Sequence, residues 1–304
     1  MADVTLSKTK FREAPHLNAS PFSAQTLLTC KTICFQSGSN FTPIFGLLPR
    51  MQREAMIVLY AFMRVTDDIA DRDQDFQSRF NELQSWKKQL GETLSGGDGN
   101  PMLVGMREVL KHFPVEPSWL FEVISGVEKD LAFCGFANAL ERDAYCYQVA
   151  SVVGLCCVAI WKGDVIKGHT PALDTGFAFQ RTNILRDLKE DFTLGRCYLP
   201  KDLLFSFGIS SHGPTDQKEE TLWDSLIRFE IGEIEKLFAS GRQLKNYLPR
   251  GGRAVFGGFM ELYHSLLQKI AKDPSIVWRE RVRVSSTQKA RILFRAFCLK
   301  WFGF

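Results

Sequence analysis

The residues best suited to chemistry are aspartates, which occur in two groups along the chain. In the first group, Asp67 and Asp71 are four residues apart within residues 50–72, a stretch without Pro or Gly whose apolar residues recur every three or four positions. This periodicity predicts a helix, and on a helix both carboxylates project from one face, together with Tyr60 and Arg64. Like charges at this spacing destabilise a helix by about 0.2–0.5 kcal/mol per pair. We therefore expect a compensating cation beside them.

The second group repeats this arrangement later in the chain. Asn183, Asp187 and Asp191 are spaced by four residues within residues 171–192, which also have a helical period. On a continuous helix they would form one oxygen-bearing stripe. Arg186 lies next to that stripe and supplies a nearby positive charge.

Two such stripes that face each other would form a cage of oxygen ligands. Mg²⁺ prefers oxygen ligands and keeps water and substrate phosphate oxygens in its coordination shell. Carboxylates repel a diphosphate, but they can hold it through bridging Mg²⁺, while arginines contact the phosphates directly. The pattern indicates an enzyme that ionises a diphosphate leaving group. The alternative is two solvated acidic helix ends, which the apolar residues around both groups make less favourable.

Other catalytic or nucleotide sites have weaker support. Glu261 and His264 form a single ExxH pair, whereas a di-iron bundle needs two such pairs and two further Glu. The sequence has no HExxH, GxGxxG, Walker or GxSxG motif. Its eight cysteines form no CxxC pair, and most lie in apolar segments. They are therefore expected to be reduced core residues of a cytoplasmic protein.

The rest of the chain is dominated by helical periodicity. Further segments with apolar residues at this spacing are 76–93, 117–135, 140–163, 215–247, 251–272 and 285–301. Alternating strands with turn signals are absent, so we expect an all-α fold of about eight to ten helices. Residues 1–304 are expected to form one domain, with 1–20 as a flexible N-terminal segment. The most apolar stretch, 149–161, is too short to cross a bilayer.

With these features in place, the chain resembles the squalene/phytoene synthase family, the head-to-head trans-isoprenyl diphosphate synthases. Five stretches carry the resemblance in order along the chain. They are NFTPIFGLLPR (40–50), YAFMRVTDDIAD (60–71), YCYQVASVVG (145–154), GFAFQRTNILRDLKEDFTLGRCYLP (176–200) and FMELYHSLLQKI (259–270). This resemblance implies an all-α isoprenoid-synthase fold with a central cavity, and condensation of two prenyl diphosphates.

The resemblance also implies roles for particular residues. Mg²⁺ would be held on one wall by Asp67 and Asp71 and on the other by Asp187 and Asp191, with Asn183 as a further polar ligand. Substrate binding is implied for Phe41, Phe45, Arg64 and Arg186. Groups near the reacting carbons would be Tyr60, Tyr145, Gln180 and Tyr263. The alternative for each tyrosine is core packing with a satisfied hydroxyl.

Within the family, the text VASVVGLCCVAIW and SNF…LLPR look most like bacterial presqualene diphosphate synthases of hopanoid pathways, which implies farnesyl diphosphate as substrate. Phytoene, dehydrosqualene and squalene synthases are the alternatives, and a non-catalytic helical scaffold is a different class. NADPH is not expected, although the family's NADPH site has no loop signature. The chain departs from the family pattern at Ser151, where Gly is usual, at Arg181, where an apolar residue is common, and at Ser37 and Ser39, where some members have His and Lys.

The small net charge of +4 comes from the C-terminal end. Residues 279–304 carry seven basic residues and one acidic residue, interleaved with aromatic and aliphatic side chains. This composition is typical of a helix at the surface of an anionic membrane. We expect peripheral membrane contact through this helix and no nucleic-acid binding, because the basic excess is too small for the latter. The alternative is that the helix only packs on the domain.

Overall fold

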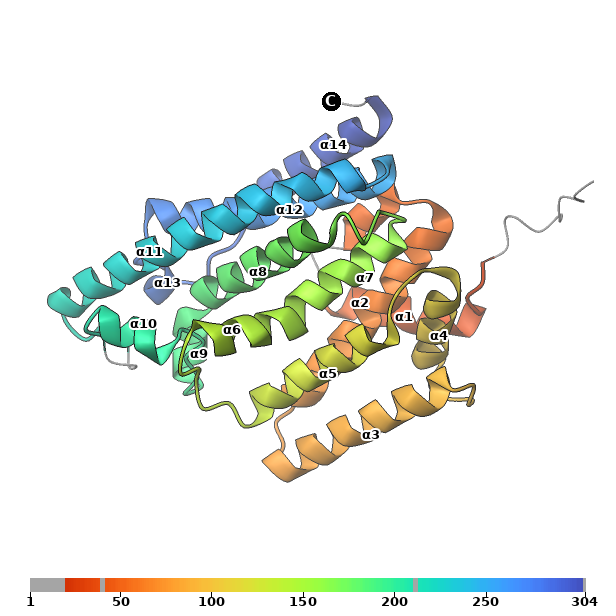
Figure 1. The fold of residues 1–304 in the computed structure, drawn as a ribbon, viewed down its shortest axis with the longest axis horizontal. Coiled ribbons are helices and arrows are strands. Elements are labelled where there is room, and N and C mark those ends of the chain that lie inside the picture. Colours follow the sequence, from red (N-terminus) through yellow and green to blue (C-terminus); the bar gives the residue numbers. More distant parts are fainter. Residues whose placement is uncertain (1–19, 39–41, 210–212, 303–304) are drawn as a thin grey trace, which may run out of the picture.

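The computed structural model describes residues 20–38, 42–209 and 213–302, and these residues form helices, turns and loops without a strand (Figure 1). The predicted all-α fold is therefore confirmed. Phe41, Ser39 and nearly all of the N-terminal segment 1–20 lie outside the described residues.

The helices follow one another with short connections. Their bounds are α1 Ala24–Gln36, α2 Arg50–Ala70, α3 Phe76–Leu94, α4 Pro101–His112, α5 Pro117–Leu131, α6 Ala139–Cys146, α7 Val152–Ile160, α8 His169–Arg186, α9 Leu188–Thr193, α10 Lys201–Ser206, α11 Gln217–Gly241, α12 Arg250–Lys272, α13 Ile276–Arg279 and α14 Ser286–Phe302. Two 3₁₀ helices, η1 (Thr42–Leu47) and η3 (Arg242–Tyr247), and one π-helical turn, η2 (Tyr147–Ser151), complete the described elements.

Helix starts follow the local sequence. The side chain of Asn100 accepts a hydrogen bond from the backbone N–H of Met102, and Pro101 occupies the first turn of α4. This pairing satisfies one free N–H and uses proline where no donor is needed. Asp216 caps α11 in the same way through Glu219.

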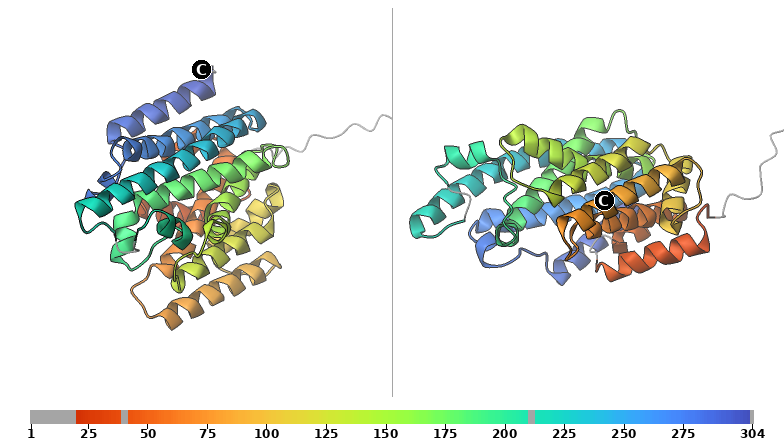
Figure 2. Two further views of the ribbon diagram at one scale, coloured as in Figure 1. Left: turned by 60° about the vertical axis from the view of Figure 1, so that its left-hand side comes forward. Right: turned by 90° about the horizontal axis from the view of Figure 1, so that it is seen from below.

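The helices share one hydrophobic core. Helix α8 is central and packs on α11, α7, α12 and η2, whereas α2 packs on α1, α4, α3 and α5. Helix α3 lies at one edge of the bundle and α14 at the opposite edge (Figures 1 and 2). This arrangement leaves α2 and α8 as facing walls, with α5, η2 and α7 between them.

Two helices that the sequence predicted as continuous are interrupted. The predicted helix 140–163 is α6, the π turn η2 and α7. The predicted helix 171–192 ends at Arg186, and Asp187 separates it from α9. Helical hydrogen bonds still run from the N–H of Asp187 to Asn183 and from the N–H of Asp191 to Asp187, so the oxygen-bearing residues follow a bent path instead of a straight stripe.

The π turn lies where α8 comes unusually close. A Cβ built on Gly176 would lie 2.4 Å from the Cα of Ser151, so only glycine fits on the α8 side. The hydroxyl of Ser151 donates to the carbonyl of Leu173 at 2.9 Å. Serine at the position where the family usually has glycine is therefore accommodated by this hydrogen bond and by Gly176.

Among the described residues, the stretch Ala139–Ile160 is the one long and apolar enough to cross a membrane. Half of its most apolar window is buried inside the protein. It contains the π turn and packs between α5 and α8, as expected for a core segment. Its apolar character is therefore explained by packing in the bundle.

Candidate active site

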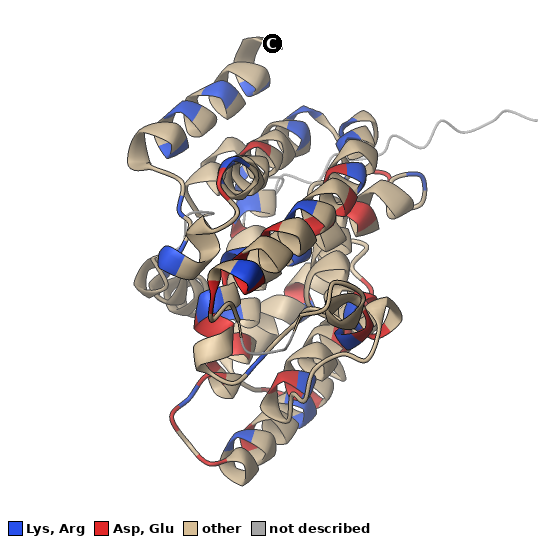
Figure 3. Ribbon diagram, turned by 90° about the vertical axis from the view of Figure 1, so that its left-hand side faces the viewer, with Lys and Arg blue, Asp and Glu red and all other residues tan. Residues whose placement is uncertain are grey.

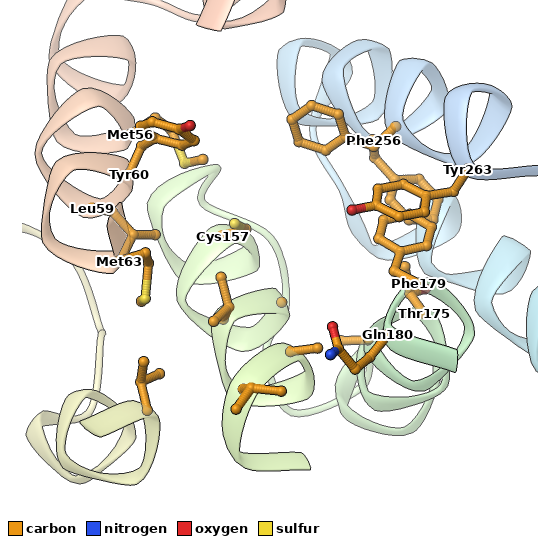
Figure 4. Close-up of a pocket in the computed structure, with 18 of the residues that line it drawn as sticks. Met56, Leu59, Tyr60, Met63, Cys157, Thr175, Phe179, Gln180, Phe256 and Tyr263 are labelled. Carbon is orange, nitrogen blue, oxygen red and sulfur yellow. The ribbon is translucent and has the colours of Figure 1, made fainter. Parts of the chain in front are cut away.

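A cavity of about 330 Å³ lies between the facing helices. Helix α2 forms one wall, α8 and α12 form the other, and η2 and α7 lie between them (Figure 4). Most of the lining is apolar: Phe45, Met56, Leu59, Met63, Val123, Val127, Val149, Ala150, Val153, Cys157, Trp161, Phe179, Leu244, Phe256 and Phe259. Such a lining suits a hydrocarbon chain.

Polar residues enter this apolar cavity at a few positions. Six of the sequence-predicted site residues line it: Phe45, Tyr60, Asp67, Gln180, Asn183 and Tyr263. The hydroxyl of Tyr263 and the amide of Gln180 point from their helices towards the α2 wall (Figure 4). The structure thus brings together residues that are up to about 200 positions apart in the sequence.

The tyrosines of the cavity are held by neighbours. The hydroxyl of Tyr60 lies 3.0 Å from the hydroxyl of Ser37, one of the residues that depart from the family pattern. The ring of Tyr263 stacks on Phe179, with centroids 4.0 Å apart and planes at 8°. Both residues line the cavity. An aromatic ring stabilises a nearby cation by about 0.5–2 kcal/mol.

A third carboxylate, that of Asp130, acts on the carboxylates of both groups. The side chain of Asp67 is exposed and lines the cavity. Desolvation by the cavity walls, together with the charge of Asp71, raises its pKa to about 7. Burial and the charge of Asp187 raise the pKa of Asp191 to about 7 as well. The charge of Asp130 on α5 contributes to both shifts. Asp130 therefore connects the carboxylates of α2 with those of α9.

Arginines accompany these carboxylates. Arg64 pairs with Asp68 one helical turn later, at 2.5 Å. Arg186 forms a two-pronged contact with the neighbouring carboxylate of Asp187, with Nε 2.8 Å from Oδ1. Arg281 lies 3.2 Å from Asp187, and the sequence pattern gave it no site role. Arginine forks of this kind bind phosphate as readily as carboxylate.

The residues of the two walls fit Mg²⁺ as a ligand set. The buried Oδ1 of Asn183 has no hydrogen-bond partner in the described structure, and an oxygen left in that state is suited to a cation. No three Asp, Glu, His or Cys side chains of the described chain meet at one point. The expected closed cage of protein oxygens is therefore not formed. Mg²⁺ needs only one or two carboxylates when phosphate oxygens and water complete its shell, so the divided ligands are compatible with it.

Tyr145 does not lie among the residues that line the cavity. Its hydroxyl donates to Asp130 Oδ2 at 3.0 Å, and the hydroxyl of Tyr198 donates to the other oxygen, Oδ1, at 2.9 Å. The two rings stack 5.5 Å apart. The structure thus places Tyr145 in a tyrosine–aspartate cluster with Asp130 and Tyr198, and its role near the reacting carbons stays a prediction.

The sequence analysis missed Asp130 and Tyr198 as site residues. Tyr198 lies inside the long stretch that carries the family resemblance, so a signal for it was present. Asp130 lies near the end of α5, an ordinary amphipathic helix, and has no carboxylate three or four residues away. Burial raises its pKa to about 6, although the hydrogen bonds from Tyr198 and Tyr145 lower it.

Replacing Asp130 by Asn is expected to lower kcat by about 10–100-fold. Asn has one acceptor oxygen in place of the two that accept from Tyr145 and Tyr198, so Tyr145 is displaced. Tyr198→Phe removes only one of the two bonds and should lower kcat by less than about tenfold. Steady-state kinetics with prenyl diphosphates would measure both. If Asp130 acts through Tyr145, the double variant Asp130→Asn, Tyr145→Phe is no slower than the worse single variant. Multiplying effects would contradict this role.

An all-α bundle around an apolar cavity, with carboxylates on two facing walls, defines the isoprenoid-synthase class. The chain belongs to the squalene/phytoene synthase family, whose profile matches residues 36–288. Members of this family condense two prenyl diphosphates head to head. Within the described residues, the five stretches that indicated this family lie on η1, on α2, on the end of α6 with η2 and α7, on α8 and α9 with the loop that follows, and on α12.

Several characterised proteins are similar over most of their length. A presqualene diphosphate synthase from Rhodopseudomonas palustris is 32% identical over 259 residues, covering 85% of this chain and 92% of the relative. A phytoene synthase from Mycobacterium tuberculosis is 30% identical over 266 residues, covering 86% and 87%. The crystal structure of a dehydrosqualene synthase superposes with a TM-score of 0.77 at 25% identity, and the match covers 90% of this chain and 95% of that structure. These relatives thus have names that state different products.

Proposed function

We propose that this protein condenses two molecules of farnesyl diphosphate to presqualene diphosphate, with Mg²⁺ bound by the carboxylates of α2 and of the α8–α9 segment. The observation that carries this proposal is an apolar cavity whose polar end combines Asp67, Asn183 and nearby arginines. The similarity to the presqualene diphosphate synthase of Rhodopseudomonas palustris supports the choice of product.

The first step is loss of diphosphate from one substrate. Its C1–O bond breaks, and the electron pair leaves with the diphosphate, which generates an allylic cation. Bound Mg²⁺ would supply positive charge to the leaving group. Arg186 and Arg281, which share the carboxylate of Asp187 here, can exchange that partner for phosphate oxygens because both present the same planar pair of acceptors.

The second step joins the two chains. The C2–C3 double bond of the second farnesyl diphosphate attacks C1 of the cation, and loss of one proton closes the cyclopropane ring. The product keeps the second diphosphate. The apolar walls exclude water, which would otherwise convert the cation to an alcohol. The stacked rings of Tyr263 and Phe179 lie beside the space where the cation would form.

Phytoene synthesis from the twenty-carbon diphosphate is the second candidate, and the similarity to the mycobacterial phytoene synthase favours it. Incubation with fifteen- and twenty-carbon diphosphates and Mg²⁺, each with and without NADPH, followed by lipid analysis, separates the two. We expect a cyclopropyl diphosphate from the fifteen-carbon substrate without reductant. Formation of a forty-carbon polyene from the twenty-carbon substrate would show that the protein makes phytoene and not the proposed product. No diphosphate release from either substrate would favour a helical scaffold without catalysis.

A further inference from the structure

The rest of the protein covers only one side of helix α14. It lies at the edge of the bundle and packs on α12 and η1 (Figures 1 and 2). The contact is made by Ile292, Ala296 and Leu299, of which the first two are buried. Beneath α14, a Cβ on Gly258 of α12 would lie 2.0 Å from Cδ1 of Ile44, so glycine is what lets η1 approach α12 there, whereas Ala296 lies at ordinary contact distance. Helix α14 is therefore anchored along a single seam.

The opposite side of α14 presents aromatic side chains to the outside. Phe294, Phe297 and Trp301 occur at i, i+3 and i+7, which is one stripe at 3.6 residues per turn and lies opposite the seam. Their exposed fractions are 66%, 44% and 57%. The rings of Phe297 and Trp301 are 6.2 Å apart. Large apolar side chains gathered in this way on one exposed surface usually mark an interaction site.

Cations flank this aromatic stripe on both sides. At the same helical period, Lys289 and Lys300 fall on one flank and Arg291 and Arg295 on the other. The ammonium group of Lys300 lies 4.8 Å from the centre of the Trp301 ring. The helix contains no Asp or Glu, and Figure 3 shows its blue segments without red ones. An aromatic stripe between two rows of cations is the arrangement of a helix that lies flat in a membrane surface.

We propose that α14 docks this protein on anionic lipid bilayers through the stripe Phe294, Phe297 and Trp301, with the flanking Arg291 and Lys300 on lipid phosphates, while Arg295 keeps its ion pair with Glu261 of α12. The charge of α14 favours an anionic bilayer over a second copy of the chain as its partner. Two α14 helices packed stripe to stripe would bring together rows of like charge, whereas an anionic bilayer neutralises them. The stripe enters the headgroup region while the Ile292–Leu299 seam stays on the domain.

Docking at this position would bring the cavity close to the lipid. The elements beneath α14 are η1, which supplies Phe45 to the cavity, and α12, which supplies Phe256, Phe259 and Tyr263. Prenyl chains partition into bilayers, so a wall facing the lipid would shorten their path to the cavity. This consequence depends on the proposed function, whereas docking itself can be tested without catalysis.

The test is sedimentation of the full-length protein with vesicles, in the absence of any prenyl diphosphate. We expect binding to phosphatidylcholine vesicles that contain phosphatidylglycerol, weaker binding to phosphatidylcholine alone, and loss of binding as salt is raised. The variant Phe294→Ser, Phe297→Ser, Trp301→Ser should lower the partition coefficient by about tenfold or more. The variant Arg291→Gln, Lys300→Gln should lower it by about fivefold for each charge, on anionic vesicles only.

A matched control removes three other exposed apolar side chains. Leu140, Ile166 and Phe205 are 81%, 89% and 85% exposed and lie outside α14. Their replacement by Ser should leave vesicle binding unchanged. The inference is overturned if the wild-type protein does not bind anionic vesicles, or if the control lowers binding as much as the α14 variants do. It is also overturned if sedimentation equilibrium shows a dimer that the aromatic variant dissociates. The two-charge variant keeps the apolar contacts of α14, so it preserves the test if the triple variant misfolds.

Discussion

Replacing Asp67 by Asn is expected to lower kcat by at least about 100-fold while the protein stays folded. The substitution removes a negative charge from the carboxylate that lines the cavity, and with it the ligand proposed to hold Mg²⁺ on the α2 wall. Asn has nearly the same shape as Asp, so the packing around it is kept. Diphosphate release, measured over a range of Mg²⁺ concentrations, would give the size of the loss.

The same substitution should not destabilise the protein. The pKa of Asp67 is raised to about 7 in the folded state, above its ordinary value in the unfolded chain. At every pH above that ordinary value, the carboxyl group therefore favours the unfolded chain, where it ionises more easily. A neutral side chain removes this cost and the repulsion with Asp71. We therefore expect the melting temperature at neutral pH to be unchanged or higher, which separates a catalytic role from a structural one.

A matched control exists in the same acidic run. Asp73 follows α2, is exposed, and does not line the cavity. Asp73→Asn changes the net charge by the same amount and should leave kcat within about twofold. If Asp67→Asn keeps wild-type turnover, or if both variants lose activity equally, Asp67 does not have the assigned role.

Replacing Glu230 by Ala is expected to have the largest effect on stability, about 3–5 kcal/mol of the free energy of unfolding. Glu230 on α11 is buried and accepts hydrogen bonds from two buried arginines, Arg142 on α6 at 3.0 Å and Arg181 on α8 at 2.8 Å. Without the carboxylate, two guanidinium groups would remain buried with insufficient negative charge near them. Urea unfolding, followed by circular dichroism, would measure the loss.

Two further variants make this prediction specific. Glu233 lies one turn later on α11, and within the described chain its ion pair is with Lys236. Replacing Glu233 by Ala should change the free energy of unfolding by no more than about 0.5 kcal/mol. Replacing the three members together, as Arg142→Met, Arg181→Leu and Glu230→Leu, should recover most of the lost stability, because apolar groups of similar size need no partner. A loss below about 1 kcal/mol for Glu230→Ala would show that water or movement of α11 compensates the arginines.

This triad also explains Arg181, which departs from the apolar residue common in the family at that position. Arg181 follows Gln180 of the cavity but faces α11, where Glu230 lies 49 positions from Arg181 and 88 positions from Arg142 in the sequence. Such a pairing has no local signal. It depends on α6, α8 and α11 meeting in the bundle.

The sequence by itself indicated the all-α class, the family and many of the candidate site residues. Helical period acts over three or four residues, so the amphipathic pattern and the spacing of Asp67 and Asp71 are local properties that can be read directly. The same spacing placed Tyr60 on the stripe of Asp67, and the family resemblance implied Gln180 and Tyr263 as candidates; all three line the cavity. It also predicted a basic aromatic helix at the C-terminal end.

Only the tertiary structure decided how these parts combine. The contact between Gly176 and Ser151, the bend at Asp187 and the sharing of Asp130 by Tyr145 and Tyr198 depend on distances between helices. A one-dimensional period shows which residues share a face of one helix, but the partner of that face is chosen by packing of the whole core. For this reason the sequence indicated which residues could perform the chemistry, and the bundle determined which of them meet.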